Sequence, residues 1–236
     1  MMQLWTPDSV RFMRDASEYG DYYPRLVSEI LPFLPKSGHI CDAGCGLGYL
    51  ASELAKHCEK VTGIDRSAAA ISEMNRRNSR AHGICADIFE YSEPFDAMVF
   101  CYFGRTGEIL RLAERLCAGT VVVIKRDCGE HTFSLGRVEH KKHTVEYTLQ
   151  DFAVRGIPYV GKKLSLEMGQ PFRSLSDAVA FYRLYDKSGV EITEERVAER
   201  LISTEREDFP LYLPSKRQME LVVFSAKDIT EGSMLR

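Results

Sequence analysis

The sequence predicts an α/β fold in which helices cover both faces of a mostly parallel sheet. Between residues 39 and 126, short apolar runs alternate with stretches of helical periodicity, which is typical of repeated strand–helix units. These runs carry few polar residues, as expected of strands that are buried on both faces. A turn with three glycines follows the first run and leads into a helical stretch.

Seven segments are strand candidates. They are residues 39–42, 60–65, 82–86, 95–101, 120–125, 162–167 and 219–226. Helices are predicted for residues 8–34, 49–57, 67–78, 106–116, 144–155, 174–185 and 193–202. Ser67 and Thr106 begin two of these helices, and Gly119 is expected to end the second. Pro24 is expected to mark the start of a second helix within residues 8–34.

Length and composition favour one domain over residues 1–236. Hydrophobic residues make up 44% and charged residues 28%, which is typical of a soluble globular protein. We expect a helical cap over residues 1–37, a core over 38–127 and a helical insertion over 172–213, between the last two strands. No apolar run approaches the roughly 20 residues that a membrane-spanning helix needs. Residues 1–10 also lack a secretory signal pattern, so a cytoplasmic protein without a membrane partner is expected.

The seven cysteines are scattered and odd in number. This favours reduced, buried thiols over a disulfide framework. Cys41 and Cys45 are spaced loosely like metal ligands, and His140 and His143 could in principle join them. Because no second Cys/His pair completes a tetrahedral set, we predict no metal site.

Charge argues against a nucleic-acid partner. The 31 basic residues are outnumbered by 34 acidic ones, and the formal net charge is −3. The densest basic clusters are short and are expected to be solvated surface, whereas phosphate binding usually needs a basic stripe. Composition leaves a homodimer open.

The most informative stretch runs from His39 to Tyr49, with glycines at 44, 46 and 48. Glycine permits positive φ and lets a ligand approach the backbone closely. A dinucleotide fingerprint (G-x-G-x-x-G) would need a small residue at position 49, where this chain has Tyr49. Asp42 would repel a phosphate but suits a ligand with a positive charge or an amino group. S-adenosylmethionine (SAM) has both a sulfonium and an α-amino group, so it fits better than NAD.

Two further aspartates follow the next two strands. Asp65 lies about 20 residues beyond the glycine turn, where an acid can accept hydrogen bonds from ribose hydroxyls. Asp87 follows the third strand. Aspartate also favours turns, so each residue alone is ambiguous. Three strand-end aspartates beside a triple-glycine turn favour a ligand site at the carboxyl edge of the sheet.

The segment Asp42-Ala-Gly44-Cys45-Gly46-Leu-Gly48 resembles motif I of class I SAM-dependent methyltransferases. The resemblance covers about residues 19–126 and implies a Rossmann-like, seven-stranded sheet whose last strand is antiparallel. It also implies that Asp42 and the turn, with Gly44, Cys45, Gly46 and Gly48, hold the methionyl part of SAM. By the same resemblance Asp65 grips the ribose beside Arg66, Asp87 takes the adenine amino group beside Ile88, and Cys101 stands at the motif IV position.

The resemblance implies methyl transfer from SAM, with S-adenosylhomocysteine (SAH) as product. Motif IV of enzymes that methylate exocyclic amino groups of bases usually reads Asn/Asp-Pro-Pro-Tyr/Phe, but this chain has Cys101-Tyr102-Phe103-Gly104. We therefore expect a small-molecule acceptor. The alternatives are a SAM-binding regulatory or scaffold subunit without catalysis, and a nucleic-acid or protein methyltransferase.

A general base is needed only if the acceptor must lose a proton. His131, in a polar loop after the fifth strand, and Tyr19 are the candidates for catalytic roles. Tyr19 could instead pack in the core. The aromatic-rich insertion over residues 172–213 is the candidate substrate lobe. Its rings at 181, 182 and 185 are interpreted first as core packing and second as a hydrophobic lid over a small acceptor.

Overall fold

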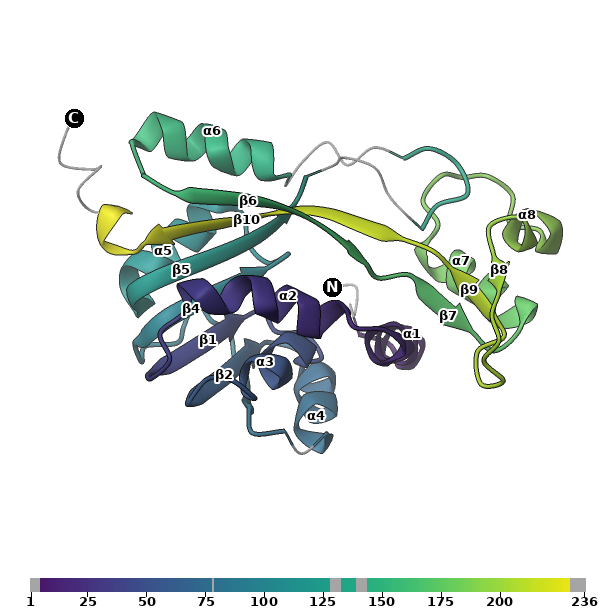
Figure 1. Ribbon diagram of the computed structural model, residues 1–236, viewed down its shortest axis with the longest axis horizontal. Coiled ribbons are helices and arrows are strands. Elements are labelled where there is room, and N and C mark those ends of the chain that lie inside the picture. The colour runs from purple at the N-terminus through teal and green to yellow at the C-terminus, as the bar shows by residue number, and fades with distance from the viewer. Residues whose placement is uncertain (1–4, 78, 128–132, 139–143, 230–236) are drawn as a thin grey trace. The chain divides into compact units, whose positions relative to one another are not determined.

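The computed structural model describes residues 5–77, 79–127, 133–138 and 144–229 (Figure 1). The chain divides into two compact units. We call residues 23–127, 143–164 and 218–236 the sheet unit, and residues 1–22, 128–142 and 165–217 the appended unit. None of the described helices is long and apolar enough to cross a membrane.

A seven-stranded sheet forms the centre of the sheet unit. Its strands are β1 (His39–Ala43), β2 (Lys60–Asp65), β3 (His82–Cys85), β4 (Phe95–Cys101), β5 (Cys117–Arg126), β6 (Val160–Glu167) and β10 (Lys216–Ser225). The order is β3-β2-β1-β4-β5-β10-β6. The pairs β1–β2, β2–β3, β1–β4 and β4–β5 are parallel, and β10 is antiparallel to β5. This confirms the mostly parallel sheet with an antiparallel last strand.

The strand order reverses at the centre of the sheet. The chain begins with β1, adds β2 and β3 on one side, and then places β4 on the other side of β1. In open α/β sheets, ligands bind outside the carboxyl ends of the strands at such a switch point. The ends of β1, β2 and β4 are therefore the place to look for a site.

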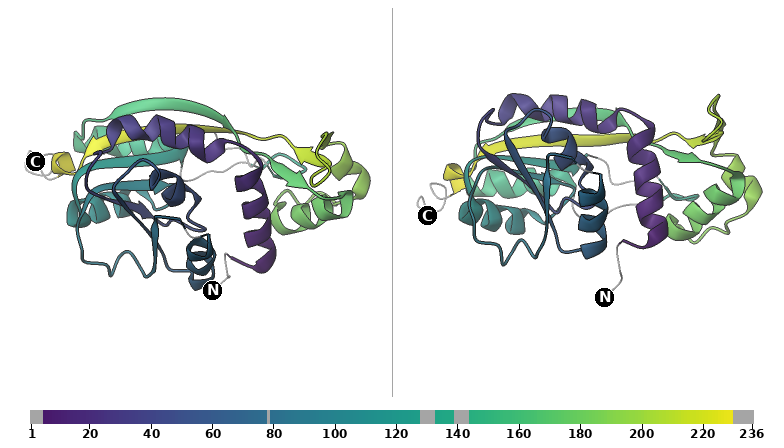
Figure 2. Two further views of the ribbon diagram at one scale, coloured as in Figure 1. Left: turned by 60° about the horizontal axis from the view of Figure 1, so that its bottom comes forward. Right: turned by 90° about the horizontal axis from the view of Figure 1, so that it is seen from below.

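Helices cover both faces of the sheet, as predicted (Figures 1 and 2). The sheet unit contains α2 (Tyr22–Ile30), a 3-10 turn (Leu31–Phe33), α3 (Tyr49–Leu54), α4 (Ala68–Arg76), α5 (Thr106–Leu116) and α6 (Val145–Arg155). On one face, Leu112 of α5 and Phe152 of α6 share a buried cluster with Cys41 of β1. Because side chains alternate along a strand, Asp42 points to the opposite face, where it accepts a hydrogen bond from Ala51 of α3.

Local signals place most helix starts correctly. The Ser67 side chain accepts a hydrogen bond from the backbone N–H of Ala70, and α4 follows it. α5 begins at Thr106, and the Glu108 side chain accepts a hydrogen bond from the Arg105 N–H just before it. α2 begins at Tyr22, two residues before Pro24.

The expectation that Gly119 ends a helix is wrong. α5 ends at Leu116, and β5 begins at the next residue, so Gly119 lies inside the strand. A Cβ there would lie 2.7 Å from the backbone oxygen of Asp96 in β4. The pairing of β4 with β5 shifts register next to Asp96, and glycine allows the close approach of the two backbones.

The appended unit is a small α/β structure of its own. It contains α1 (Pro7–Tyr19), β7 (Gln170–Phe172), α7 (Leu175–Tyr185), α8 (Glu194–Ala198), β8 (Ile202–Ser203) and β9 (Leu211–Leu213). The three strands form an antiparallel sheet in the order β7-β9-β8, which the sequence did not predict. The helix predicted over residues 193–202 ends at Ala198.

Aromatic rings fill the core of this appended unit. Phe12, Phe172, Phe181 and Tyr182 are at most 2% exposed. The rings of Phe12 and Phe181 meet edge to face with centroids 5.1 Å apart, a favourable arrangement for aromatic pairs. Phe181 and Tyr182 of the insertion are therefore core residues.

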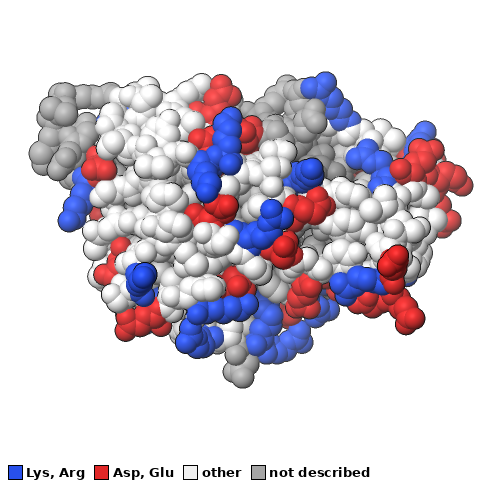
Figure 3. All heavy atoms as spheres, viewed as in Figure 1, with Lys and Arg blue, Asp and Glu red and all other residues white. Residues whose placement is uncertain are grey.

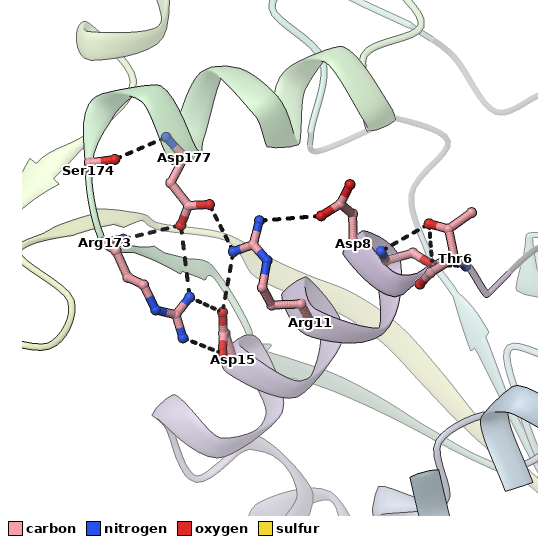
Figure 4. Close-up of polar contacts among 8 residues, drawn as sticks. Thr6, Asp8, Arg11, Asp15, Arg173, Ser174 and Asp177 are labelled. Carbon is pink, nitrogen blue, oxygen red and sulfur yellow. Dashed lines mark hydrogen bonds and ion pairs between the residues drawn. The ribbon is translucent and has the colours of Figure 1, made fainter. Parts of the chain in front are cut away.

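A network of ion pairs joins α1 to the start of α7 (Figure 4). Asp15 is 5% exposed, and Arg173 donates two hydrogen bonds to its carboxylate, at 2.5 and 2.9 Å. Arg11 pairs with Asp177 at 2.8 Å and lies 3.8 Å from Asp15. The hydrogen bond to Asp15 raises the pKa of Arg173. The network ties two segments that are about 160 residues apart in the chain.

Candidate functional site

The turn after β1 has the backbone conformation that its glycines predict. Gly44, Gly46 and Gly48 have φ angles of 69°, 52° and 71°, in the left-handed region that other residues rarely adopt. The Gly44 N–H donates to the Ile64 carbonyl at 2.8 Å, and the Gly48 N–H donates to the Cys45 carbonyl at 2.8 Å. The turn is thus held against the end of β2 before α3 begins.

Packing also requires glycine at two of these positions. A Cβ on Gly44 would lie 2.2 Å from the Phe103 ring, and a Cβ on Gly48 would lie 2.2 Å from the sulfur of Met74. Sequence reasoning assigned the glycines to close approach by a ligand. The structure adds that protein side chains already fill the space of a Cβ at Gly44 and Gly48.

Asp42 has the most unusual environment in the site. Its side chain is 1% exposed. It accepts a hydrogen bond from the Ala51 N–H in the first turn of α3, but its Oδ2 has no hydrogen-bond partner in the described part of the chain. Burial raises the pKa of Asp42 to about 7, the charge of Asp65 adds to the rise, and the bond from Ala51 opposes it. A buried carboxylate oxygen without a partner is costly and suits a cationic or hydrogen-donating ligand.

Asp65 links the end of β2 to the glycine turn. Its Oδ2 accepts from the Gly46 N–H at 3.0 Å, and its Oδ1 accepts from the Ser67 N–H at 2.9 Å. A carboxylate has about four lone-pair positions, so these two bonds leave capacity for a diol. Arg66, the next residue, is exposed.

The end of β3 contributes a polar and an apolar residue. Asp87 is exposed, and its Oδ1 accepts from the Phe89 N–H at 2.9 Å. Ile88 is 4% exposed and belongs to the main core cluster of the sheet unit. β2 and β3 pair at Asp65 and Cys85, so Asp87 lies two residues beyond the paired end of the strand.

Two cysteines, Cys45 and Cys101, lie in the glycine turn and at the end of β4. Cys45 and Cys101 are half-buried, and burial is the main cause that raises the pKa of both thiols. The charge of Asp42 adds to the rise at both. The described residues contain no cluster of three or more His, Cys, Asp or Glu that could hold a metal ion. His140 and His143 lie outside the described residues.

The turn after β4 carries a strained residue that sequence reasoning did not single out for its backbone. Tyr102 has a φ of 54°, which is uncommon for a bulky residue and characteristic of functional sites. Its side chain is 42% exposed, and its N–H donates to the Ile124 carbonyl at 3.0 Å.

Lys125, near the end of β5, is 4% exposed and donates to the Gly104 carbonyl at 2.6 Å. Burial lowers the pKa of Lys125.

The two candidates for catalytic roles lie outside the part of the sheet unit described above. His131 lies outside the described residues. Tyr19 belongs to the appended unit, where its ring stacks on Tyr212 with centroids 4.9 Å apart. The Arg206 guanidinium also lies 4.7 Å from the ring of Tyr19. These contacts are those of a packed ring within the appended unit.

Comparison with known proteins decides the family. Residues 34–163, more than half of the chain, match the family described as "Methyltransferase domain". The chain belongs to this family. It is a protein with a methyltransferase domain on a Rossmann-like sheet. The matched region contains all the residues from Asp42 to Cys101 that the sequence assigned to the donor.

One curated relative is the ribosomal RNA small subunit methyltransferase C of Klebsiella pneumoniae, 39% identical over 80 residues. The match covers 33% of this methyltransferase and only 22% of the relative. Among solved structures, a Bacillus halodurans protein described as a candidate methyltransferase is 10% identical, with a TM-score of 0.55, over 88% of this chain and 99% of that one. The YcgJ protein of Bacillus subtilis is 9% identical, with a TM-score of 0.53, over 86% and 98%. At such identities the likeness shows the fold.

Proposed function

We propose that this methyltransferase transfers the methyl group of SAM to a small molecule. The observation that carries the donor half of the proposal is the buried Asp42 carboxylate, whose Oδ2 has no partner in the described residues. An amino group or a sulfonium beside it would supply the missing positive charge. A pyrophosphate would instead bring two negative charges close to Asp42.

The residues at the strand ends suit the successive parts of SAM. Asp42 and the turn of Gly44, Cys45, Gly46 and Gly48 would hold the methionyl part. Asp65 retains acceptor capacity for the ribose hydroxyls, with Arg66 beside the adenine. Asp87 and Ile88 would take the amino group and one face of the adenine, and Cys101 would line the site below them.

The sulfonium of SAM supplies an activated leaving group, so the chain mainly has to bind, align and exclude water. Asp42 can balance the positive charge of the donor in a place that water does not reach. The rigid turn at Tyr102 would set the position of an acceptor beside β4. Where the acceptor must lose a proton, Tyr19 and His131 are the proposed candidates to take it.

Two observations support a small acceptor. The position of the Asn/Asp-Pro-Pro-Tyr/Phe signature holds Cys101, Tyr102 and Phe103, with Tyr102 in a left-handed conformation. Figure 3 shows lysine and arginine side chains lying among aspartates and glutamates on the face it draws, rather than in one basic area. Phosphate backbones favour proteins with a basic surface.

The described cysteines are free thiols, which supports a reducing compartment such as the cytoplasm.

A calorimetric titration tests the donor half directly. Purified protein should bind SAM and SAH with a stoichiometry of about one, and should not bind NAD. Absence of heat at millimolar SAM would contradict the proposal.

Labelled methyl transfer tests the acceptor half. The protein and methyl-labelled SAM are incubated with a cell extract divided into metabolites, RNA and protein, and the label should enter the metabolite fraction. The rRNA methyltransferase relative favours RNA as the second candidate. Label in RNA, with binding that weakens steeply as salt rises, would establish that candidate instead.

A further inference from the structure

Three side chains of the sheet unit stack beside the glycine turn. The Arg77 guanidinium lies 3.9 Å from the centre of the Tyr49 ring, which follows Gly48 directly. The Tyr49 ring in turn stacks on Tyr23 of α2, with centroids 5.6 Å apart and planes 21° from parallel. Arg77 is the C-cap residue that directly follows α4, so the stack joins α2, α3 and the end of α4.

The Arg77 side chain also binds the backbone of the glycine turn. Its Nη2 donates a hydrogen bond to the carbonyl oxygen of Leu47, between Gly46 and Gly48. Bonds from Gly44 and Cys45 to Ile64, and from Gly46 to Asp65, fix the first half of the turn to β2. Arg77 fixes the second half from a different element.

Such a turn needs external support. Three of its five residues are glycines, which lose more conformational freedom on ordering than any other residue. A turn that is ordered only when the ligand arrives weakens binding by the free energy of ordering. A planar guanidinium that stacks on a ring and donates to a carbonyl is well suited to hold the turn in place beforehand.

The arrangement has a cost for the folded protein. Arg77 Nη1 is buried and has no hydrogen-bond partner in the described part of the chain. An unpaired donor of this kind disfavours the fold, and a role in the site accounts for its presence.

We propose that Arg77 is a positioning residue of the methyl-donor site. It acts through Leu47 and Tyr49, without touching the donor, and keeps the glycine turn in its binding conformation. The inference rests on the proposed placement of SAM at this turn.

The test compares Arg77→Met with Arg76→Met in the full chain. Methionine keeps an apolar stem against Tyr49 but loses the donors. Arg76 is the exposed neighbour on α4 that pairs with Glu73, so its variant is the matched control. Arg77→Met should raise the dissociation constant for SAH about tenfold by calorimetry, and Arg76→Met should leave it unchanged. Arg77→Lys, which can still donate to Leu47, should recover part of the affinity.

Amide hydrogen exchange of the ligand-free protein separates positioning from general stability. In Arg77→Met the amides of Gly46 and Gly48 should exchange about tenfold faster, while that of Val222 in β10 should not change. Equal acceleration at all three amides, or an unchanged affinity for SAH, would overturn the proposal.

Two features keep the test decisive. If Arg77→Met does not fold, Tyr49→Leu removes the ring on which the Arg77 guanidinium stacks but keeps the apolar bulk, and it should show the same selective exchange. If the wild type binds no SAH, the proposed function fails. The exchange experiment, which needs no ligand, would still decide whether Arg77 holds the turn.

Discussion

Replacement of Asp42 by asparagine should make the free energy of unfolding depend less on pH. Burial raises the pKa of Asp42 from its reference value of 3.8 to about 7. This rise in pKa corresponds to a difference of roughly 4 kcal/mol in the stability that the protonated and charged forms of Asp42 confer on the fold. Asparagine has nearly the same shape and no charge, so it removes this titration.

The sign follows from proton binding. Between pH 3.8 and about 7 the folded state holds the Asp42 proton more tightly than the unfolded state. Unfolding therefore releases a proton, and stability falls as pH rises through this window. About 3 kcal/mol of this contribution to stability is lost between pH 5 and pH 8. Below pH 3.8 both states are protonated, and this contribution is constant.

Urea unfolding of the wild type and Asp42→Asn at pH 5, 6, 7 and 8 measures the effect. The stability of the variant minus that of the wild type should increase by about 3 kcal/mol from pH 5 to pH 8. The unpaired amide of asparagine adds a constant of about 1–3 kcal/mol, which cancels in this comparison. A difference that stays flat with pH would show that Asp42 does not titrate as its burial requires.

Three further predictions concern the donor site, the appended unit and the β4 turn. Asp65→Ala should weaken SAM binding by about 1–3 kcal/mol, or roughly 5- to 150-fold by calorimetry, because it removes half-buried hydrogen-bond acceptors. Asp15→Ala should lower the free energy of unfolding by about 2–3 kcal/mol in urea, because it leaves Arg173 without its buried partner. Tyr102→Gly should be more stable than Tyr102→Ala by about 1 kcal/mol, because only glycine adopts a φ of 54° without strain.

Each of these has a matched control or a contrary outcome. Asp151→Ala changes a carboxylate on α6 that pairs with Arg155, and it should not alter SAM binding. Asp8, whose side chain is 74% exposed and 3.8 Å from Arg11, should contribute less than about 0.5 kcal/mol when changed to alanine. Tyr102→Ala at least as stable as Tyr102→Gly would show that the turn relaxes rather than stores strain.

The central sheet could be predicted because its signals are local. Each buried strand is a short apolar run, and the predicted strand over residues 60–65 coincides with β2. Ser67 and Ser174 each directly precede a helix, and each side chain accepts a hydrogen bond from a backbone N–H of its first turn. The antiparallel β10 came from the resemblance to the family rather than from its own residues.

Features set by long-range contacts could not be predicted. β8 has two residues, and β7 and β9 have three each, which is too short for an alternating pattern. Gly119 resembled a helix stop because glycine both ends helices and allows two strand backbones to approach closely. Only the position of Asp96 in β4 decides between these two roles. The residues of the site also divide into those with local signals and those set by long-range contacts. The residues that the sequence assigns to the donor follow strands that can be recognised locally. Arg77 follows a different helix, and Tyr102 shows its strain only in its backbone angles.

The filling of the glycine positions by Phe103 and Met74 has a consequence for how such chains diverge. A descendant that no longer methylated anything would still favour glycine at 44 and 48, because a Cβ there would press on Phe103 and Met74 and the backbone has a positive φ. The Asp42 carboxylate is different, because burial makes its charged form costly to the folded protein. If Asp42 holds the donor as proposed, loss of that single charge with the glycines intact would mark a chain that has given up donor binding.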